Sequence, residues 1–334
     1  MARVGVVFAT LAAVAAVSSG CTGAEPDAAP GDAESSSTTP STEPTPPPPT
    51  STNPTTTEPP PTTYGPARFL PSAAVATVEH LAGTIGPRLA SSPAYDRAAD
   101  WVQRRFASYG YDVSNQRVRV PAGDSWGVPV EGGTSRNVVA TPPDFDPGKP
   151  WRLVGAHLDT VAAAPGAEDN GSGVAVLLEL ARLSAGRPTA LPTVFVAFGA
   201  EEPLGEGEAW HHFGSRLHAD GLPPAERRML RAMVALDRVG VGAGGIVPVC
   251  TGGVGPLRVR NDLIATGRRL GIATSACADN SSSDHYSYEL VGVTAARLGS
   301  TPYAGYHSSG DIPAVVEPAQ LGRVGRLMWA WLQP

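Results

Sequence analysis

The first part of the folded sequence carries apolar side chains at helical spacing. Residues 72–81 and 94–109 are predicted as amphipathic helices, and Gly110 ends the second of them. In that second segment the apolar positions recur every three or four residues, which places them on one face. Alternating or β-branched runs then predict strands over residues 113–120 and 137–140.

Farther along the chain, short apolar runs alternate with helical segments. The runs are predicted as buried strands over residues 152–156, 193–198, 229–236 and 293–298. Helices are predicted over residues 172–185 and 318–332. Apolar strands that alternate with helices are typical of a largely parallel sheet covered on both faces. We therefore predict one α/β domain over residues 67–334, with a mixed, mainly parallel sheet flanked by helices on both faces.

The N-terminus has the pattern of an export signal. Residues 1–21 contain a positive charge at Arg3, a short apolar run, and small residues before Cys21. The apolar run is short for a membrane span. Small residues followed by Cys resemble the lipobox of bacterial lipoproteins, although Ser18 replaces the usual Leu or Val. We expect an exported protein and favour a lipid at Cys21, which makes it a cell-surface lipoprotein; plain secretion is the alternative.

Residues 22–66 differ in composition from the rest. They are rich in Pro, Thr and Ser, and no Lys or Arg occurs between Arg3 and Arg68. Such a segment buries too little apolar surface to offset its conformational entropy. We predict a disordered linker that holds the following domain away from a membrane; an unimportant tail is the alternative.

The composition and the number of cysteines indicate which binding partners and cross-links to expect. The 334 residues carry a formal net charge of −6, and no basic stripe is visible, so we do not expect nucleic-acid binding. Membrane contact is expected only through the N-terminal lipid. If Cys21 is acylated, Cys250 and Cys277 remain, and in an oxidising setting they can form a disulfide or stay as two separate thiols.

Side chains that suit a metal follow the predicted strands. Parallel strands place their carboxyl ends at one edge of a sheet, where ligands bind. The residues found there are His157, Asp159, Asp169, Glu201, Glu202, Asp237 and His307. Imidazole and carboxylate are zinc ligands, and burying several carboxylates without a counter-charge is costly. This set of residues predicts a two-metal site.

Residues 70–334 resemble the secreted bacterial di-zinc aminopeptidases of the leucine aminopeptidase and aminopeptidase Y type, in peptidase clan MH. The resemblance is carried by residues 155–159, 166–173, 198–202, 236–237 and 306–307, with Asp311, in the family's order. It implies a phosphorylase/hydrolase-like zinc-exopeptidase architecture, peptide substrates and two Zn²⁺ ions, or other divalent metals. One ion would bind His157, Asp169 and Asp237, and the other would bind Asp169, Glu202 and His307.

The resemblance also assigns roles around the metals. Asp159 would orient His157, and Glu201 would be the general base that accepts a proton from the attacking water and returns it to the departing amine. Tyr306 would donate a hydrogen bond to the oxyanion. The implied function is a zinc-dependent aminopeptidase.

This sequence departs from the family in two places. The stretch after Glu202 is longer, and its Trp210, His211 and His212 either line the substrate rim or form an exposed loop with a packed Trp, which we favour. Arg238 stands where an apolar residue is usual, and three interpretations are open: it binds a substrate carboxylate, pairs with Glu206, or faces solvent. His285 is expected to be structural.

Other functions are compatible with the same scaffold. A carboxypeptidase, a dipeptidase, an amidohydrolase, or a glutaminyl cyclase with one zinc would use similar residues. A cell-surface lipoprotein that uses the fold only for binding would be expected to lack a ligand or the base, and no position is missing here. The preferred side chain, the native metal and the oligomeric state are not indicated by the sequence.

Overall fold

The computed structural model describes residues 65–334. The predicted signal peptide, the lipid site at Cys21 and the linker up to residue 64 lie outside the described residues. Within the described range, none of the helices combines the length and apolar character needed to cross a membrane.

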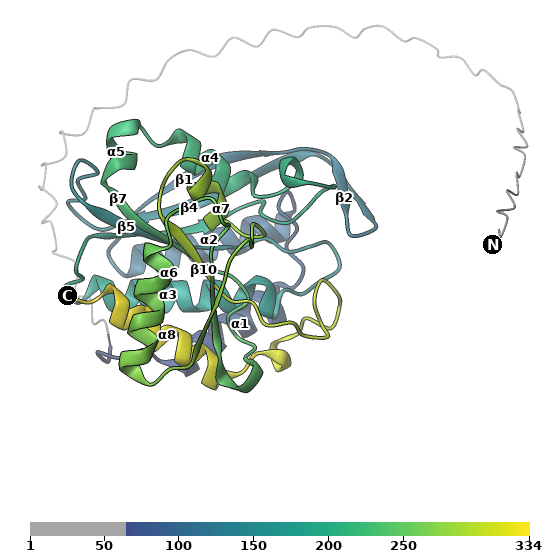
Figure 1. Cartoon of the computed structure of the whole chain (residues 1–334). Helices are drawn as coiled ribbons and strands as arrows, with labels where there is room; N and C mark the ends of the chain where they lie inside the picture. Colours follow the sequence, from purple (N-terminus) through teal and green to yellow (C-terminus); the bar gives the residue numbers. More distant parts are fainter. Residues whose placement is uncertain (1–64) are drawn as a thin grey trace, which may run out of the picture. The chain divides into compact units, whose positions relative to one another are not determined.

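The centre of the domain is an eight-stranded mixed sheet, with strand order β1-β4-β6-β5-β7-β10-β8-β9 (Figure 1). The strands are β1 (Asp112–Val120), β4 (Gly133–Thr141), β5 (Trp151–His157), β6 (Thr193–Phe198), β7 (Leu230–Leu236), β8 (Val247–Cys250), β9 (Thr274–Cys277) and β10 (Ala295–Leu298). Neighbours among β6, β5, β7 and β10 run parallel. Antiparallel pairs join β1 to β4, β4 to β6 and β8 to β10. The predicted α/β fold with a mixed sheet is confirmed.

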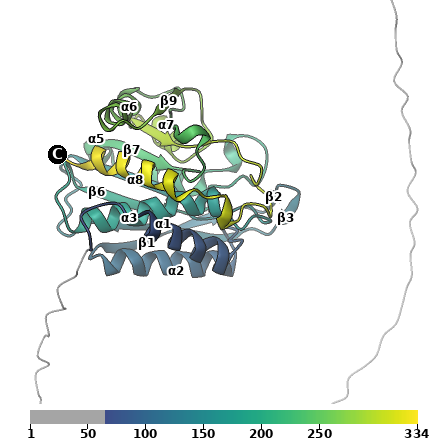
Figure 2. The same ribbon diagram turned by 90° about the horizontal axis from the view of Figure 1, so that it is seen from below.

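Helices cover both faces of the sheet. One face packs against α1 (Pro71–Val78), α2 (Pro93–Ser108), α3 (Gly173–Ala185), α6 (Arg258–Leu270) and α8 (Pro318–Leu332). The other face packs against α4 (Phe213–Gly221), α5 (Pro224–Met229) and α7 (His285–Leu290). Figure 2 looks onto the first of these layers, where α3, α1 and α8 lie side by side. Short helical turns occupy Glu79–Ile85, Ala167–Ser172, Glu208–Trp210, Ala243–Gly245 and Pro313–Val315.

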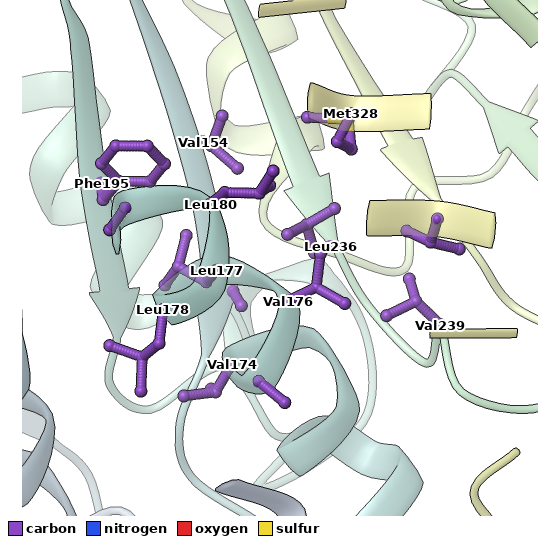
Figure 3. Close-up of a cluster of buried hydrophobic side chains, with 14 of the residues drawn as sticks. Val154, Val174, Val176, Leu177, Leu178, Leu180, Phe195, Leu236, Val239 and Met328 are labelled. Carbon is purple, nitrogen blue, oxygen red and sulfur yellow. The ribbon is translucent and has the colours of Figure 1, made fainter. Parts of the chain in front are cut away.

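Helix α3 is the centre of the larger hydrophobic core. Its residues from Gly173 to Leu183 are buried, because it lies between the sheet and the surrounding helices. Leu177 and Leu178 pack near Phe195 of β6, and Met328 of α8 lies on the opposite side (Figure 3). Each such buried side chain contributes about 1.5–3 kcal/mol. This burial explains why the helix is apolar on nearly all sides. The packed helix also holds the loop before it in place.

A small hairpin projects from the sheet near its carboxyl edge. It consists of β2 (Gly123–Ser125) and β3 (Val128–Val130), joined by Trp126 and Gly127 with φ of 53° and 85°. Positive φ at both turn residues is characteristic of a type I′ hairpin turn. The sequence does not predict this hairpin, because Trp-Gly lacks the usual Asn-Gly or Asp-Gly signal. Strands β8 and β9 and the helices α4 to α7 were not predicted either.

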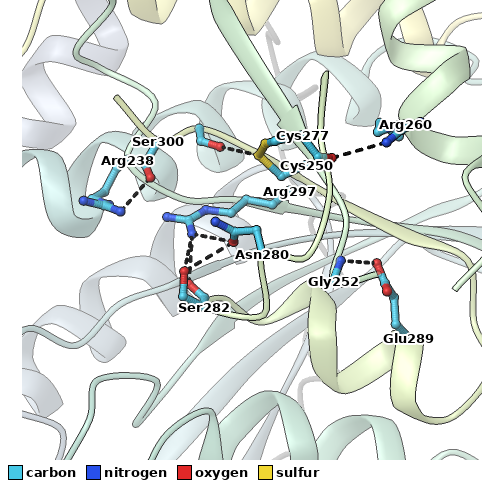
Figure 4. The surroundings of a disulfide bond; sticks show 11 residues. Arg238, Cys250, Gly252, Arg260, Cys277, Asn280, Ser282, Glu289, Arg297 and Ser300 are labelled. Carbon is cyan, nitrogen blue, oxygen red and sulfur yellow. Dashed lines mark hydrogen bonds between the residues drawn. A yellow bond between two sulfur atoms is a disulfide. The ribbon is translucent and has the colours of Figure 1, made fainter. Parts of the chain in front are cut away.

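A disulfide joins the two edge strands at the far end of the sheet. Cys250 on β8 and Cys277 on β9 face each other in the parallel register, with Cα atoms 4.5 Å apart (Figure 4). The cross-link closes a loop that contains α6 and attaches the short outer strand β9 to the sheet. Of the two possibilities left open for these cysteines, the structure has the bridge.

Candidate metal centre

The candidate metal ligands meet at one edge of the sheet because their strands are parallel neighbours. His157 is the last residue of β5, and Glu202 follows β6, which pairs with β5 on one side. Asp237 follows β7, which pairs with β5 on the other side. His307 lies in the loop after β10, beside β7. The edge-of-sheet arrangement expected from the sequence is therefore present.

Asp169 lies between the two histidines. His157 Nε2 is 3.1 Å from Asp169 Oδ1, and His307 Nε2 is 3.2 Å from Asp169 Oδ2. On the first side, Asp237 Oδ1 is 3.8 Å from His157 Nε2. On the second side, Glu202 Oε2 is 3.3 Å from His307 Nε2. One carboxylate thus presents an oxygen to each of two ligand sets, as a bridging ligand does.

The ligand set has unsatisfied polar atoms and clustered charge. Within residues 65–334, Glu202 Oε1, Asp237 Oδ1 and His307 Nδ1 are buried without a hydrogen-bond partner. Burial and the charge of Asp169 raise the pKa of Glu202 to about 8. Burial acts against ionisation of Asp169 as well, but hydrogen bonds from His157 and His307 lower the pKa of that carboxyl. A divalent cation would pair these oxygens and neutralise the charge, so the donor set fits zinc.

Asp159 was expected only to orient His157, but it also contacts the turn that carries Glu201 and Glu202. Its Oδ1 lies 3.8 Å from His157 Nδ1, while its carbonyl oxygen lies 3.2 Å from the same nitrogen. The carboxylate also accepts hydrogen bonds from the backbone N–H groups of Glu201, at 3.0 Å, and Glu202, at 3.1 Å. One side chain therefore holds the turn that carries both glutamates next to His157.

Further buried groups hold the Asp169 loop, and only part of this support was recognised in the sequence. Asp311, which belongs to one of the family motifs, accepts hydrogen bonds from the backbone N–H of Glu168 at 2.8 Å and of Asp169 at 3.1 Å. Arg88 is fully buried and donates to the carbonyl oxygens of Leu158 at 2.7 Å and Gly166 at 2.8 Å. The guanidinium links the segment after His157 to the loop that leads into Asp169.

Arg297 was missed because it lies inside an apolar strand. Its side chain is buried on β10, and Nη2 lies 3.0 Å from Asp237 Oδ2. Burial opposes ionisation of Asp237, but the charge of Arg297 lowers the pKa of that carboxyl. Arg297 therefore keeps Asp237 available as an anionic ligand.

Glu201 lies beside the ligands and contacts a buried histidine. Its Oε2 is 3.8 Å from His157 Nε2, and its Oε1 is 3.0 Å from His212 Nε2. Burial raises the pKa of Glu201 to about 8. His212 is only 2% exposed, so our preference for an exposed loop over residues 203–212 was wrong for this residue. It holds for Trp210, which is 39% exposed and packs against Gly205.

A cavity of about 190 Å³ opens above these groups. Besides the acids and histidines, its lining includes Trp126, His211, Arg238 and Tyr306. The Tyr306 ring stacks on His307 with centroids 3.7 Å apart, and Trp126 contacts the same imidazole edge-on at 4.4 Å. His285, by contrast, is fully buried and does not line the cavity, in keeping with a structural role.

The part of the sequence that carries these ligands matches a known protein family. Residues 137–332, which include every ligand candidate, match the model of peptidase family M28. The chain belongs to peptidase family M28.

Curated relatives match parts of the chain. YfbL of Escherichia coli K12 is 33% identical over 185 residues, which is 52% of this chain and 51% of that protein. Aminopeptidase YwaD of Bacillus subtilis is 42% identical over 87 residues, or 26% of this chain and 18% of the relative. The chain thus spans about half the length of the first relative and less of the second.

Solved structures share the fold over most of the described domain. A zinc aminopeptidase from Bacillus subtilis has a TM-score of 0.70 at 20% identity, covering 80% of this chain and 95% of that one. An aminopeptidase from Aneurinibacillus has a TM-score of 0.68 at 21% identity, covering 79% and 93%. A glutaminyl cyclase from Bacteroides thetaiotaomicron has a TM-score of 0.67 at 17% identity, covering 79% and 98%. At these identities the likeness concerns the fold.

Strained backbone in this M28 domain gathers around the metal centre. Ala200 precedes the glutamate pair with φ of 58°, Arg238 follows Asp237 with φ of 55°, and His307 itself has φ of 52°. A left-handed conformation at a residue other than glycine costs on the order of 1–2 kcal/mol. Such a cost is accepted where the direction of a side chain matters, and here it directs three loops toward the cavity.

Proposed function

We propose that the chain is an exported zinc metallo-exopeptidase that removes N-terminal residues from peptides by a two-metal mechanism. The observation that carries the proposal is the position of Glu201. This carboxylate lies next to the two proposed ligand sets, which share Asp169, at the base of an accessible cavity. Glu201 is close enough to His157 and Asp237 to be a ligand with them, but Asp169 takes that place in the proposed sets, so Glu201 stays available as the base. A base beside a metal pair is the arrangement that hydrolysis of a peptide bond needs.

Each ligand set has a definite composition under this proposal. His157, Asp169 and Asp237 would hold one ion, and Asp169, Glu202 and His307 would hold the other. When bound, a pair of zinc ions supplies activation of water and polarisation of the scissile carbonyl.

The protein's own residues perform the proton transfers. Glu201 accepts a proton from the attacking water through one carboxylate oxygen, while its other oxygen lies 3.0 Å from His212 Nε2. Burial raises the pKa of Glu201 and so strengthens this carboxylate as a proton acceptor. Glu201 then delivers the proton to the departing amine. Tyr306, at the cavity wall, is proposed to donate to the oxygen that gains negative charge.

The charge of the cavity supports removal of N-terminal residues. A free α-ammonium group is complementary to an acidic side chain, and Glu201, which the proposed ligand sets leave free, lines the cavity. A blocked amine would place an uncharged amide beside this carboxylate. We therefore expect the enzyme to act on free N-termini and to reject N-acylated ones.

Export and lipidation are proposed from the signal-like residues 1–21 and the linker that follows. A lipid at Cys21 would place the wild-type protein in the detergent phase of a Triton X-114 separation, and Cys21→Ala would move it to the aqueous phase. Equal partitioning of the two proteins would exclude the anchor.

Glutaminyl cyclase chemistry is the second candidate, because solved glutaminyl cyclases share the fold at TM-scores of 0.67 and 0.66. Family enzymes of that kind use one zinc, whereas the ligand sets here favour two. Native mass spectrometry of the purified protein counts the metals. One zinc together with cyclisation of N-terminal glutamine would support this second function.

Hydrolysis of aminoacyl p-nitroanilides tests the primary proposal. We expect activity that is lost on chelation and restored by zinc. Glu201→Gln should lower kcat by about 10²–10⁴-fold while zinc content is retained. Glu206→Gln is a matched control, because Glu206 is an exposed residue of the same loop that does not line the cavity. A zinc-loaded wild type without activity on any unblocked substrate would remove the proposal.

A further inference from the structure

The cavity contains an arginine, Arg238, whose side chain is held in place although most of its hydrogen-bond donors are unused. Arg238 follows Asp237 directly, and its backbone N–H donates to Asn170 Oδ1 at 3.2 Å. Its Nη2 donates to Ser300 Oγ at 2.6 Å (Figure 4), and its guanidinium lies 4.2 Å above the Tyr306 ring centroid. The side chain is 14% exposed and lines the cavity. Its orientation is therefore fixed before a substrate arrives.

Most of the donors on Arg238 have no acceptor. A guanidinium carries five N–H groups. Among the described residues, the bond to Ser300 is the side chain's one hydrogen bond. Nε lies 3.9 Å from Asp237 Oδ1 and 4.0 Å from Asp169 Oδ2, which is beyond hydrogen-bond distance. Glu206, considered as a partner from the sequence, makes no contact with it among the described residues.

Arg297 is the neighbouring cation of the same cavity and shows the opposite pattern. It is 1% exposed, pairs with Asp237 at 3.0 Å, and donates through Nη1 to Asn280 and Ser282 (Figure 4). Arg297 thus serves the ligand set. Arg238 is left with planar donors that point into a space where substrate binds.

The chemistry of these donors favours a carboxylate. Stacking on an aromatic ring and a fixed fork of N–H groups are the features with which arginine binds planar anions in a bidentate manner. The nearby carboxylates would repel such an anion if they were free, but Asp169 and Asp237 are both candidate metal ligands. A metal-loaded centre therefore leaves Arg238 as a cation available to a substrate.

The distance from the metal centre indicates which carboxylate can reach it. Nε lies about 4 Å from oxygens of both Asp169 and Asp237, one of which faces each ligand set. Arg238 therefore adjoins both ligand sets, and an anion that pairs with its guanidinium would lie next to a carbonyl held at the metal centre. In a dipeptide, the α-carboxylate stands one residue beyond the only peptide bond.

We propose that Arg238 binds the C-terminal carboxylate of dipeptides and makes free dipeptides the preferred substrates. This inference rests on the proposed function and specifies its substrate class. Longer peptides place an uncharged amide at the same point and lose the charge-assisted contact. The rival explanation is that Arg238 only balances the charge of the ligands, in which case substrate carboxylates should have no special effect.

Paired substrates that differ only at the C-terminus test the proposal. The zinc-loaded enzyme is given Leu-Leu and Leu-Leu-amide, and the ratio of their kcat/KM values is measured, because losses common to both substrates cancel. A charge-assisted bidentate contact should make the free acid better by about tenfold or more. Arg238→Met should reduce that ratio to near one, and Arg238→Lys should restore part of it.

Binding without turnover provides the second measurement. In the Glu201→Gln background, calorimetry should show that Leu-Leu binds at least about tenfold more tightly than its amide, and Arg238→Met should abolish the difference. Arg231→Met is the matched control, because Arg231 is exposed at the opposite end of the same strand β7.

The outcomes separate the two levels of the proposal. Hydrolysis of both substrates at equal rates, or an equal loss on both in Arg238→Met, would overturn the dipeptide inference while the exopeptidase proposal stands. Absence of hydrolysis of every substrate with a free N-terminus would instead overturn the proposed function.

Discussion

The base and the wall of the cavity are built in different ways. We call the metal-ligand candidates the floor: His157, Asp169, Glu202, Asp237 and His307. We call the side chains around the opening the rim: Trp126, His211, Arg238 and Tyr306. Floor side chains are buried, and all of them except Asp169 end or follow strands of the central sheet. Rim side chains come from loops, and Trp126 and Tyr306 are 58% and 40% exposed.

This difference separates chemistry from selectivity. The floor is held by backbone hydrogen bonds to Asp159 and Asp311 and by the buried Arg297, so little can change there without loss of the ligands. The rim is held by stacking and by single hydrogen bonds. Loops on a rigid scaffold are where related proteins vary their binding preferences. We therefore expect floor substitutions to remove activity and rim substitutions to change which peptides are bound.

Among the substitutions that test the difference between floor and rim, Asp159→Asn is expected to have the largest effect, which is on zinc affinity. The amide would keep one acceptor but turn an NH₂ group toward the backbone N–H of Glu201 or Glu202. Loss of an outer partner of a metal-bound His typically costs 10–100-fold in metal affinity or activity. Zinc affinity, measured by competition with a chelating dye, should fall by about this factor.

Asp146→Asn is the control for that substitution, because Asp146 is an exposed residue whose carboxylate contacts Lys149 and the backbone N–H of Gly148, away from the floor. It should leave zinc affinity unchanged. If Asp159→Asn also left it unchanged, the floor would not depend on the support described here.

The floor could be predicted from the sequence, and the physical reason is the strand pattern. The apolar runs show where β5, β6 and β7 end. A polar residue that directly follows a parallel strand lies at the carboxyl edge of the sheet. His157, Glu202 and Asp237 were located in this way, and the resemblance added how they would share two metals. Asp169 needed the motif around it, because no strand precedes it.

The rim could not be predicted by the same argument. Trp126 lies on a hairpin whose turn lacks the usual residues, and its approach to His307 joins parts of the chain 181 residues apart (307 − 126). His212 looked like a loop residue because nothing in the local pattern reveals its bond to Glu201. Contacts between distant loops depend on how the whole domain packs, and a single sequence does not show this.

An intermediate effect is expected at His218, which lies behind the floor. This buried ring packs near Phe198, the residue that ends β6, and its Nδ1 is 2.8 Å from the hydroxyl of Tyr288. Burial lowers the pKa of His218 to about 4. Between pH 6.5 and 4 the unfolded chain therefore binds a proton that the folded protein does not, so the free energy of unfolding falls as the pH is lowered through this range.

The size of this effect follows from the two pKa values. Between pH 7 and pH 5 the contribution of His218 should fall by about 2 kcal/mol. His218→Gln and His218→Asn remove the titrating ring, so the difference between their stabilities at the two pH values should be smaller than that of the wild type by this amount. Urea denaturation measures it, and comparison at equal zinc concentration cancels the effect of pH on the metals. An unchanged pH dependence in both variants would show that the ring is protonated in the fold.

The smallest effect, and the sharpest test of the rim, is expected for Trp126→Ala. The exposed indole contacts the rings of His307 and Tyr306 at 4.4 and 6.1 Å and forms one wall of the cavity. Loss of one aromatic contact of about 0.5–1.5 kcal/mol should raise KM roughly 2- to 10-fold for dipeptides with bulky side chains, and less for Gly-Gly. Because Trp126 lies outside the hydrophobic core, kcat and Tm should change little. Trp210→Ala is the control, since Trp210 is also partly exposed but does not line the cavity. An equal rise in KM for bulky and small substrates, or a fall in kcat as large as that of a floor variant, would mean that the hairpin supports the metal centre and that floor and rim are not separate.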